Sequence, residues 1–592
     1  METITNALQA VLDGFTGLSS EFPLFGVWYT TVIRFVLPVL ALLILLTAIR
    51  SLLAVKHLPE TWAYLSLPNG ERIPLTHWEN IIGRAKTADV VLGYPSVSRT
   101  HAAVTRNDRG EWTLYELGST GGTCVGGKRV DGNAMLEDGD VLSFGGVETV
   151  FLPVPAGEKR AERKSRAAEA RPAPPWGPLI LLTLFQVLTA LQLVLAKGGE
   201  ATVNIPLVFL GLTAVMWGYC LTLRAMRRVG FEMELIAFFL CTLSLSVTAS
   251  TDPDDLVKIF ITMLLGLAGF MLLCGILRNL ERAQQLRWLM AAGAIGLLAI
   301  TLVIGTGDYG AKNWIKFGGF SFQPSEIAKI CYIFAGAATL DRLFKKRNLT
   351  LFIVLTALCG GCLALMNDFG TALIFFITFL VIAYLRSGDW ATLALICSGC
   401  GIGGMMLLRL KPHVAARFAV WGHAWQDASD KGFQQVRTMS ASASGGLVGV
   451  GAGNGWLKGV FAADTDLVFG MLCEEFGFII ACLSVLCILT LAVFAVRACR
   501  AGRSSFYTIA ACAATSMMVF QTCLNVFGAV DILPLTGVTF PFVSNGGSAM
   551  LSAWGLLAFL KATDTRQNAS FAVRLPSRRE LRREEAMGYE ED

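Results

Sequence analysis

Charged residues are scarce in this sequence. They make up 16% of its 592 residues, against about 25% in soluble domains, while hydrophobic residues make up 54%. This balance excludes an ordinary soluble globular protein and predicts a chain that crosses a membrane many times. The formal net charge of +5 is small for this length, so we expect no nucleic-acid partner.

Histidines are also few, and the cysteines are poorly placed to form disulfides. There are five histidines, and no Cys or His cluster accompanies His413 and His423, so no metal-binding residues are predicted. Most of the fifteen cysteines lie inside apolar runs, where thiols pack as small hydrophobic groups, so we expect no disulfide framework. The N-terminus lacks the basic stretch of a cleavable signal peptide, and none is expected.

Long apolar runs are abundant. A membrane-spanning helix needs about 20 mostly apolar residues, and the first such run extends from about Phe35 to Val55. Twelve more lie at 176–197, 204–223, 231–250, 255–277, 287–306, 324–340, 350–366, 370–386, 391–408, 467–497, 505–530 and 546–560. The sequence therefore predicts a polytopic α-helical membrane protein with about 13 transmembrane helices.

Basic residues are concentrated in alternate connections between these runs. The clusters lie at 159–171, 224–228, 278–287, 342–347, 497–503 and 561–583. Because cytoplasmic loops carry the excess of Lys and Arg, we place every cluster on the inner face. The segments 198–203, 251–254, 307–323, 411–466 and 531–545 then face outward. On this assignment 411–466 is a large extracytoplasmic loop and the tail, 566–592, is cytoplasmic.

One region has the composition of a soluble domain. It follows an N-terminal segment, 1–58, that holds the first helix. Residues 59–155 are polar and rich in glycine, with short alternating runs such as Trp112-Thr113-Leu114-Tyr115. This pattern predicts an inserted all-β sandwich on the cytoplasmic side. Residues 156–175 are a charged, proline-rich linker that is too polar to fold alone.

Four motifs give the sandwich a family resemblance. They are Ile82-Gly83-Arg84, Ser98-Arg99-Thr100-His101, Gly118-Ser119-Thr120-Gly121-Gly122-Thr123 and Asp138-Gly139-Asp140. In this order they resemble the forkhead-associated (FHA) domain, which binds phosphothreonine on loops at one end of its sandwich. The resemblance implies that the phosphate is held by Arg84, Ser98, Arg99 and Thr120, with His101 bracing the loop. Cations and hydroxyl donors suit a phosphate.

The FHA resemblance has one departure. Where the family usually has asparagines that grip the bound peptide, this sequence has Gly121 and Gly126. Two interpretations therefore stay open. The domain binds phosphothreonine through its remaining cations, or the fold serves only as a protein contact surface.

The run at 324–340 begins with a polar motif, Gln323-Pro324-Ser325-Glu326. Proline in the first turn and an acid facing the helix dipole predict a helix start. Lys329 follows three residues after Glu326, on the same helical face inside a span. Ionisable groups there are costly and usually functional. A purely structural Glu326–Lys329 ion pair is the alternative.

Further motifs follow in the outward segments. They are Asn367-Asp368-Phe369-Gly370, Trp425-Gln426-Asp427-Ala428, Gly432-Phe433-Gln434, Ser444-Gly445-Gly446, Glu474-Glu475-Phe476-Gly477, Pro534-Leu535-Thr536-Gly537 and Ser544-Asn545-Gly546-Gly547-Ser548. With the motif at 323–326, the ordered set over 231–565 resembles the shape, elongation, division and sporulation (SEDS) family. Members usually carry ten membrane helices, so the resemblance implies that the N-terminal helix, the sandwich and the helices at 176–230 are an added front half.

The SEDS resemblance implies a peptidoglycan glycosyltransferase. Such an enzyme polymerises lipid II into glycan strands at the outer face of the bacterial cytoplasmic membrane, during division or elongation. Asp427 matches the family's essential aspartate and is the implied general base, although Ala428 and Phe433 depart from the family motif. Asp430 is a nearby competitor, and a merely solvated Asp427 stays open. Substrate binding is assigned to Lys329, Glu326, Arg417, Gln434, Gln323 and Ser325.

Two other acids are expected to have structural roles. We expect Asp368 to cap the next helix and Asp466 to structure its loop. No cofactor is certain, and a divalent cation, Mg or Mn, is a candidate at the lipid pyrophosphate.

Two other functions remain. One is a transporter (flippase) of the same lipid, for which we find no inverted repeat. The other is a non-catalytic scaffold of a division or elongation complex. The expected partners are lipid II, a class B penicillin-binding transpeptidase, and a phosphothreonine-containing protein from a Ser/Thr kinase pathway.

Overall fold

The computed structural model describes residues 9–10, 14, 23–54, 59–155, 157–158, 174–564 and 569, with short breaks at 87, 108, 156, 309–310, 318–319, 342–345, 388–389, 500 and 503. Most of the predicted linker, 156–175, and of the tail, 566–592, lies outside the described residues. The same holds for the basic clusters at 159–171 and 342–345.

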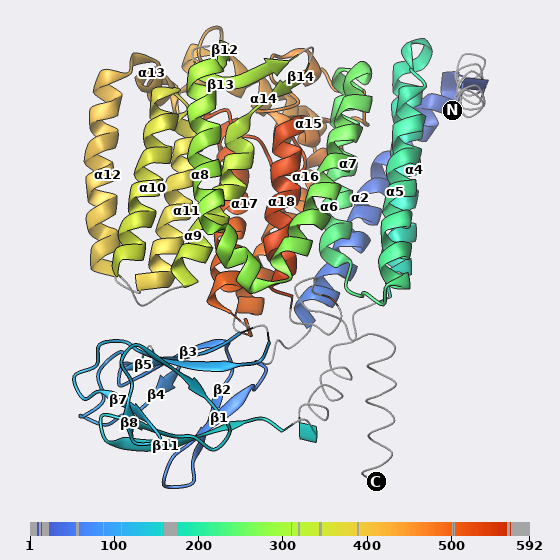
Figure 1. Ribbon diagram of the computed structural model, residues 1–592. Coiled ribbons are helices and arrows are strands. Elements are labelled where there is room, and N and C mark those ends of the chain that lie inside the picture. The colour runs from blue at the N-terminus through green and yellow to red at the C-terminus, as the bar shows by residue number, and fades with distance from the viewer. Residues whose placement is uncertain are drawn as a thin grey trace.

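A bundle of long helices forms the larger part of the molecule (Figure 1). Its helices are α2 (Pro23–Ala54), α4 (Trp176–Lys197), α5 (Asn204–Ala225), α6 (Glu232–Thr251), α7 (Leu256–Leu277), α8 (Leu280–Ile304), α9 (Pro324–Asp341), α10 (Lys346–Leu365), α11 (Phe369–Ser387), α12 (Trp390–Leu410), α16 (Gly477–Cys499), α17 (Ser505–Ala529) and α18 (Gly547–Ala562). Among the described residues nine helices are long and apolar enough to cross a membrane, and three shorter helices are also apolar. The polytopic membrane fold is confirmed, while the number of spans stays a prediction.

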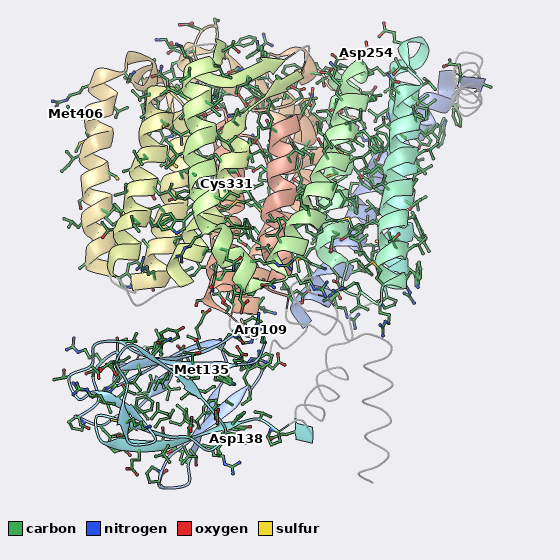
Figure 2. The ribbon with its side chains drawn as sticks, in the orientation of Figure 1. Arg109, Met135, Asp138, Asp254, Cys331 and Met406 are labelled. Atoms are coloured by element: carbon green, nitrogen blue, oxygen red, sulfur yellow. The ribbon has the colours of Figure 1, made fainter. Side chains whose placement is uncertain are left out.

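Two helices lie at the centre of the bundle. The window of α6 that is apolar enough to span is fully buried inside the protein. On α18, Trp554 contacts Phe238, Phe270 and Phe542 at ring-centroid distances of 5.4, 5.6 and 5.5 Å. A Cβ on Gly266 would lie 2.6 Å from the Trp554 ring, so glycine is what lets α7 and α18 pack closely. By contrast, Met406 on the peripheral helix α12 points outward (Figure 2).

Two predicted spans were wrong in their limits. The first helix begins at Pro23, well before Phe35, because the aromatic residues at 25–29 extend the apolar run. The predicted run at 467–497 is two helices, α15 (Val468–Glu475) and α16. They are separated because Gly477 has φ +87° and a Cβ there would lie 2.4 Å from the Gly449 nitrogen.

The connections at one end of the bundle carry additional structure (Figure 1). A three-stranded sheet follows α8, in the order β12 (Thr306–Asp308), β13 (Ala311–Phe317), β14 (Phe320–Phe322). The predicted loop 411–466 contains α13 (Pro412–Val420), the 3-10 turns η3 (Ala424–Asp427) and η4 (Leu457–Gly459), and α14 (Phe433–Gly445). The sequence did not predict this sheet.

The inserted domain is a sandwich of two sheets. One has the order β4 (Val90–Val91), β3 (Glu79–Gly83), β5 (Ala102–Arg106), β6 (Trp112–Glu116), β9 (Asn133–Leu136). The other has the order β2 (Arg72–Leu75), β1 (Ala63–Ser66), β11 (Val147–Pro153), β10 (Val141–Phe144), β7 (Thr123–Val125), β8 (Lys128–Arg129). Trp112 and Phe151 meet between them edge to face, 5.3 Å apart. The predicted all-β domain is confirmed.

The sandwich lies against the end of the bundle opposite to β12–β14 (Figure 1). Glu79, the first residue of β3, accepts hydrogen bonds from Ser504 Oγ (2.8 Å), the Ser505 nitrogen (3.0 Å) and Ser505 Oγ. His77 Nδ1–H donates to the Gly502 carbonyl at 2.6 Å. Trp78 packs against the apolar core of the bundle. The domain is therefore seated on the turn between α16 and α17.

Candidate functional site

The start of α9 buries an ion pair. Pro324 and Ser325 open the helix, and Glu326 lies in its first turn, as the sequence predicts. Lys329 Nζ lies 2.6 Å from Glu326 Oε1, with both side chains at most 5% exposed. A lysine ammonium has three donors, and this is the one hydrogen bond that Lys329 makes within the described residues. Two donors of a buried cation are therefore left for another acceptor.

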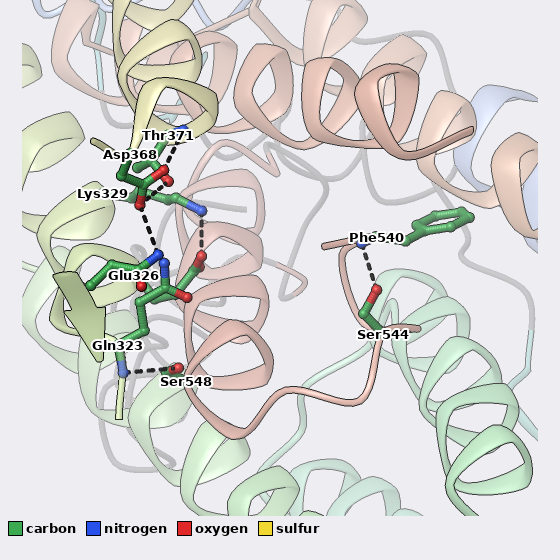
Figure 3. A network of polar contacts seen from close by, with 9 residues as sticks. Gln323, Glu326, Lys329, Asp368, Thr371, Phe540, Ser544 and Ser548 are labelled. Carbon is green, nitrogen blue, oxygen red and sulfur yellow. Dashed lines mark hydrogen bonds and ion pairs between the residues drawn. The ribbon is translucent and has the colours of Figure 1, made fainter. Parts of the chain in front are cut away.

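Neighbouring motifs surround this pair (Figure 3). The Gln323 nitrogen donates to Ser548 Oγ at the start of α18, at 3.3 Å. Asp368 caps α11, because it accepts from the Thr371 nitrogen (3.1 Å) and hydroxyl (3.0 Å). The Asn313 amide on β13 donates to the same carboxylate at 3.3 Å. The expected cap is confirmed, and motifs distant in sequence meet around the start of α9.

Ser325 is buried beside the pair, and its hydroxyl has no hydrogen-bond partner in the described part of the chain. A buried polar group without a partner costs about 1–3 kcal/mol. The site thus combines unused donors from Ser325 and Lys329, which suits a polar or anionic ligand.

The segment 464–466 is held by the loop between α17 and α18. Asn545 donates to Asp464 through its backbone nitrogen (2.8 Å) and its amide (2.7 Å). Asn525 on α17 donates to the Asp466 carbonyl at 3.0 Å. Gly537, at φ +69°, lies against the Asp466 carboxylate, which would be 3.2 Å from a Cβ there. These contacts support the expected structural role of Asp466.

Arg417 provides a cation near this segment. Its side chain on α13 is exposed. Burial raises the pKa of Asp466 to about 6, and the charge of Arg417 opposes that rise. The positive charge of Arg417 thus favours the ionised form of the Asp466 carboxylate.

Asp427 ends the turn η3, and its side chain is exposed. Its carbonyl accepts from the nitrogens of Asp430 (3.1 Å) and Gly432 (3.0 Å), while within the described residues its carboxylate makes no hydrogen bond or ion pair. Gly432 permits the turn, because a Cβ there would lie 2.2 Å from the Ala424 carbonyl oxygen. Gln434 donates to the Phe461 carbonyl at 2.9 Å, so part of this amide is already used.

The predicted residues thus form three groups. Gln323, Ser325, Glu326 and Lys329 gather at the start of α9. Arg417 lies close enough to Asp466 for its charge to lower the pKa of that carboxyl. Asp427 and Gln434 lie on the turn before α14 and at its start. Within the described residues no hydrogen bond or ion pair joins Asp427 to Lys329 or Arg417. The helices α13 and α14, between which Asp427 lies, and β14, which precedes α9, lie at the same end of the bundle (Figure 1).

Two acids without a predicted role, Glu474 and Glu475, position the glycine-rich segment 445–457. Glu474 accepts from the nitrogens of Trp456 (2.9 Å) and Leu457 (3.0 Å). Glu475 accepts from the Gly453 nitrogen (3.0 Å) and the Ser250 hydroxyl. On α4, the Gln192 amide donates to the Ala452 carbonyl at 3.4 Å. The sequence signal for this role was a pair of adjacent acids shortly before a glycine. Their carboxylates fix the backbone of this segment.

A second candidate site lies on the sandwich loops. Ser98 Oγ accepts from the Thr120 nitrogen at 3.0 Å, and Arg84 N donates to the Ser98 carbonyl at 2.9 Å. Arg84, Arg99 and Thr120 are exposed. The structure therefore brings all four predicted phosphate residues to one set of loops.

His101 braces these loops, as expected. It is fully buried. Its Nδ1 accepts from the Ser98 nitrogen at 3.1 Å, and its Nε2–H donates to the Gly122 carbonyl at 3.1 Å. These partners fix a single neutral tautomer. At Gly121 a Cβ would lie 2.7 Å from the Gly145 Cα, so this backbone position has no room for a side chain.

Within the described ranges no three His, Cys, Asp or Glu residues gather closely enough to hold a metal ion. The described side chains therefore do not form a cage of protein ligands for a divalent cation.

Two family models match the chain. The cell cycle protein family FtsW/RodA/SpoVE matches residues 223–569, and the FHA domain matches residues 80–145. The first model begins slightly before the predicted boundary at 231, and the second lies inside the predicted 59–155.

Individual relatives agree with the first model. The peptidoglycan glycosyltransferase RodA of Mycobacterium leprae is 29% identical over 317 residues, which is 50% of this chain and 67% of that protein. The probable peptidoglycan glycosyltransferase FtsW of Pseudoalteromonas translucida is 32% identical over 271 residues, or 43% and 67% of the two chains. A solved structure from a peptidoglycan synthase complex is 25% identical and covers 57% of this chain and 98% of that one, with a TM-score of 0.47.

The first model alone covers more than half of the chain, and the motif order and the membrane bundle agree with it. The protein therefore belongs to the FtsW/RodA/SpoVE family and carries an FHA domain ahead of the family region.

Proposed function

We propose that this protein is a peptidoglycan glycosyltransferase that polymerises lipid II into glycan strands. The observation that carries the proposal is the buried Lys329 ammonium. It donates one hydrogen bond to Glu326, and within the described residues its other two donors are available to a ligand at the start of α9. A lipid pyrophosphate supplies anionic acceptors of the kind that such donors bind. Family membership supplies the reaction class.

The proposed step joins two substrate molecules. The Asp427 carboxylate accepts the proton of the acceptor sugar hydroxyl. The hydroxyl oxygen bonds to the anomeric carbon of the donor sugar, and the bond from that carbon to the lipid pyrophosphate breaks. Lys329 and Arg417 stabilise the negative charge on the leaving group. Asp427 suits the base role because its carboxylate is exposed and makes no hydrogen bond or ion pair with the other described residues.

The chemistry is proposed to occur outside the cell. The FHA domain and β12–β14 lie at opposite ends of the bundle (Figure 1), and Asp254, between α6 and α7, lies at the end away from the sandwich (Figure 2). With the basic connections inside, the sandwich and the C-terminal tail are cytoplasmic, and 411–466 is extracytoplasmic. A divalent cation, Mg or Mn, would come with the pyrophosphate, since Mg²⁺ often binds through substrate phosphates.

A proteoliposome assay separates this function from its alternatives. The full chain is reconstituted with fluorescent lipid II, and the fate of the lipid is followed. We expect glycan strands on a gel. Lipid II that changes leaflet without being joined would instead identify a transporter, and lipid II that is neither moved nor joined would identify a scaffold.

We further propose that the FHA domain reads a phosphothreonine. Arg84→Ala is expected to weaken binding of a phosphothreonine peptide by about 10- to 100-fold, because it removes a charge-assisted hydrogen bond of about 1.5–3 kcal/mol. Calorimetric titration of the full chain measures this. Arg72→Ala, an exposed arginine on β2, is the control. Equal binding by wild type and Arg84→Ala, or no binding at all, would contradict the proposal.

The FHA domain also contacts the membrane region directly. The Glu79 carboxylate binds the first residues of α17, so Glu79→Ala is expected to release this helix end. A lost N-terminal cap costs about 0.5–2 kcal/mol, which corresponds to faster amide exchange at 504–508 by roughly 2- to 30-fold. Hydrogen-exchange mass spectrometry measures it. Glu148→Ala on β11 should leave the exchange unchanged, and the same result for Glu79→Ala would refute the contact.

Two partners complete the proposal. A class B penicillin-binding transpeptidase would crosslink the strands, because polymerised glycan is the substrate of crosslinking. A phosphothreonine protein from a Ser/Thr kinase pathway would bind the FHA loops.

A further inference from the structure

One acid outside every motif contacts the turn that carries Asp427. Asp531 follows α17 and has φ +60°. Left-handed backbone is uncommon for residues other than glycine, and asparagine and aspartate tolerate it best. Such strain persists where the surrounding structure requires it, often at functional sites.

Both oxygens of Asp531 accept hydrogen bonds from this turn. Oδ1 accepts from the Gly422 nitrogen at 3.1 Å and Oδ2 from the Ala424 nitrogen at 3.2 Å. Gln435, on α14, donates to Oδ1 at 3.5 Å. The next residue adds a fourth bond, because Trp421 Nε1–H donates to the Ile532 carbonyl at 2.9 Å. The two chain segments that flank Asp427 are thus tied to one carboxylate.

Apart from its own backbone hydrogen bonds and the packing of Gly432, the turn has little other support within the described residues. Its apolar support is a small cluster of Val420, Ala424 and Val436, while the side chains of Trp425, Gln426 and Asp427 are exposed. A four-residue 3-10 turn has few hydrogen bonds of its own. The position of Asp427 therefore depends on the base of the turn, where Asp531 binds.

We propose that Asp531 is a positioning residue for the transferase reaction, which holds the Asp427 turn at a fixed distance from the bundle. The proposal rests on the proposed function, in which Asp427 is the base. A misplaced catalytic group lowers the rate of the chemical step, while substrate binding elsewhere is kept. The loss should therefore appear in kcat rather than in KM.

Asp531→Gly tests this sharply, because glycine accepts the left-handed conformation that strains aspartate. We expect thermal stability equal to or above that of wild type, kcat for strand formation lowered by about 10- to 100-fold, and KM for lipid II within about threefold. Asp531→Asn, which keeps one acceptor oxygen, should lie between the two. Asp254→Gly, another exposed acid at the same end, is the control.

Two readouts make the proposal falsifiable whatever the variant does. In Asp531→Gly with Asp427→Asn, the losses should not multiply, because both act through one carboxylate. Amide exchange at 421–424 should speed up in Asp531→Gly even without substrate. If exchange is faster but the wild-type protein forms no strands, the proposed function is wrong, while the contact between Asp531 and the Asp427 turn is confirmed. Unchanged exchange in Asp531→Gly, a wild-type kcat, or a parallel fall in kcat and stability would contradict the role of Asp531 as a positioning residue.

Discussion

Asp427→Asn is expected to lower the rate of strand formation by about 100-fold or more, with lipid II still bound. General-base catalysis contributes about 10²- to 10⁴-fold, and asparagine keeps the size of the side chain but cannot take the proton. Because the carboxylate is exposed and unpaired within the described residues, the exchange should not destabilise the fold. Initial rates at saturating lipid II, with thermal unfolding alongside, measure both effects.

Asp430→Asn is the matched control for this prediction. Asp430 lies on the same turn, and its carbonyl accepts from the Phe433 nitrogen at 3.2 Å. If Asp427 is the base, the control keeps most of its activity. Loss of activity in Asp430→Asn with normal activity in Asp427→Asn would move the base to Asp430.

The second large effect is expected at Lys329. Lys329→Met leaves the Glu326 carboxylate buried without its partner, which costs about 3–5 kcal/mol. We expect lower thermal stability and no strands. This loss alone does not separate a structural pair from a substrate site.

The double variant Glu326→Gln with Lys329→Met separates the two interpretations. It removes both charges, and replacing a whole buried pair is often neutral for stability. We expect the fold to recover while strand formation does not, because the pyrophosphate has lost its cation. Wild-type rates in a stable double variant would show that the pair is structural.

The helix α17 connects the FHA domain to the opposite end of the bundle. Glu79 binds the first residues of α17 on the FHA side. At the other end of α17, Asn525 holds the Asp466 carbonyl and Asp531 holds the Asp427 turn. Allosteric coupling needs an element that two sites both bias. The helix α17 is contacted by the FHA domain at one end and by the segments of Asp466 and Asp427 at the other.

The sequence predicted features whose signal is local. Proline and an acid at 324–326 marked the start of α9, and Asp368 was recognised as a cap. The FHA loops followed from four motifs in order. Each depends on residues a few positions apart, whose backbone preferences are readable without the fold.

Contacts between distant segments were not predictable in the same way. The break before α16 depends on crowding between Gly477 and Gly449. The seat of the sandwich depends on Glu79 meeting Ser504 and Ser505. Asp531 had only a weak signal, an acid directly after a helix end. In each case the partner is set by packing, which no spacing rule encodes.

Product analysis shows directly whether the membrane region joins lipid II molecules. The purified full chain would be incubated with labelled lipid II, and glycan length and released lipid pyrophosphate would be measured in the same sample. We predict strands of many disaccharides and one pyrophosphate released for each bond formed. Lipid II that stays intact after incubation with the folded protein would show that the membrane region is not a polymerase.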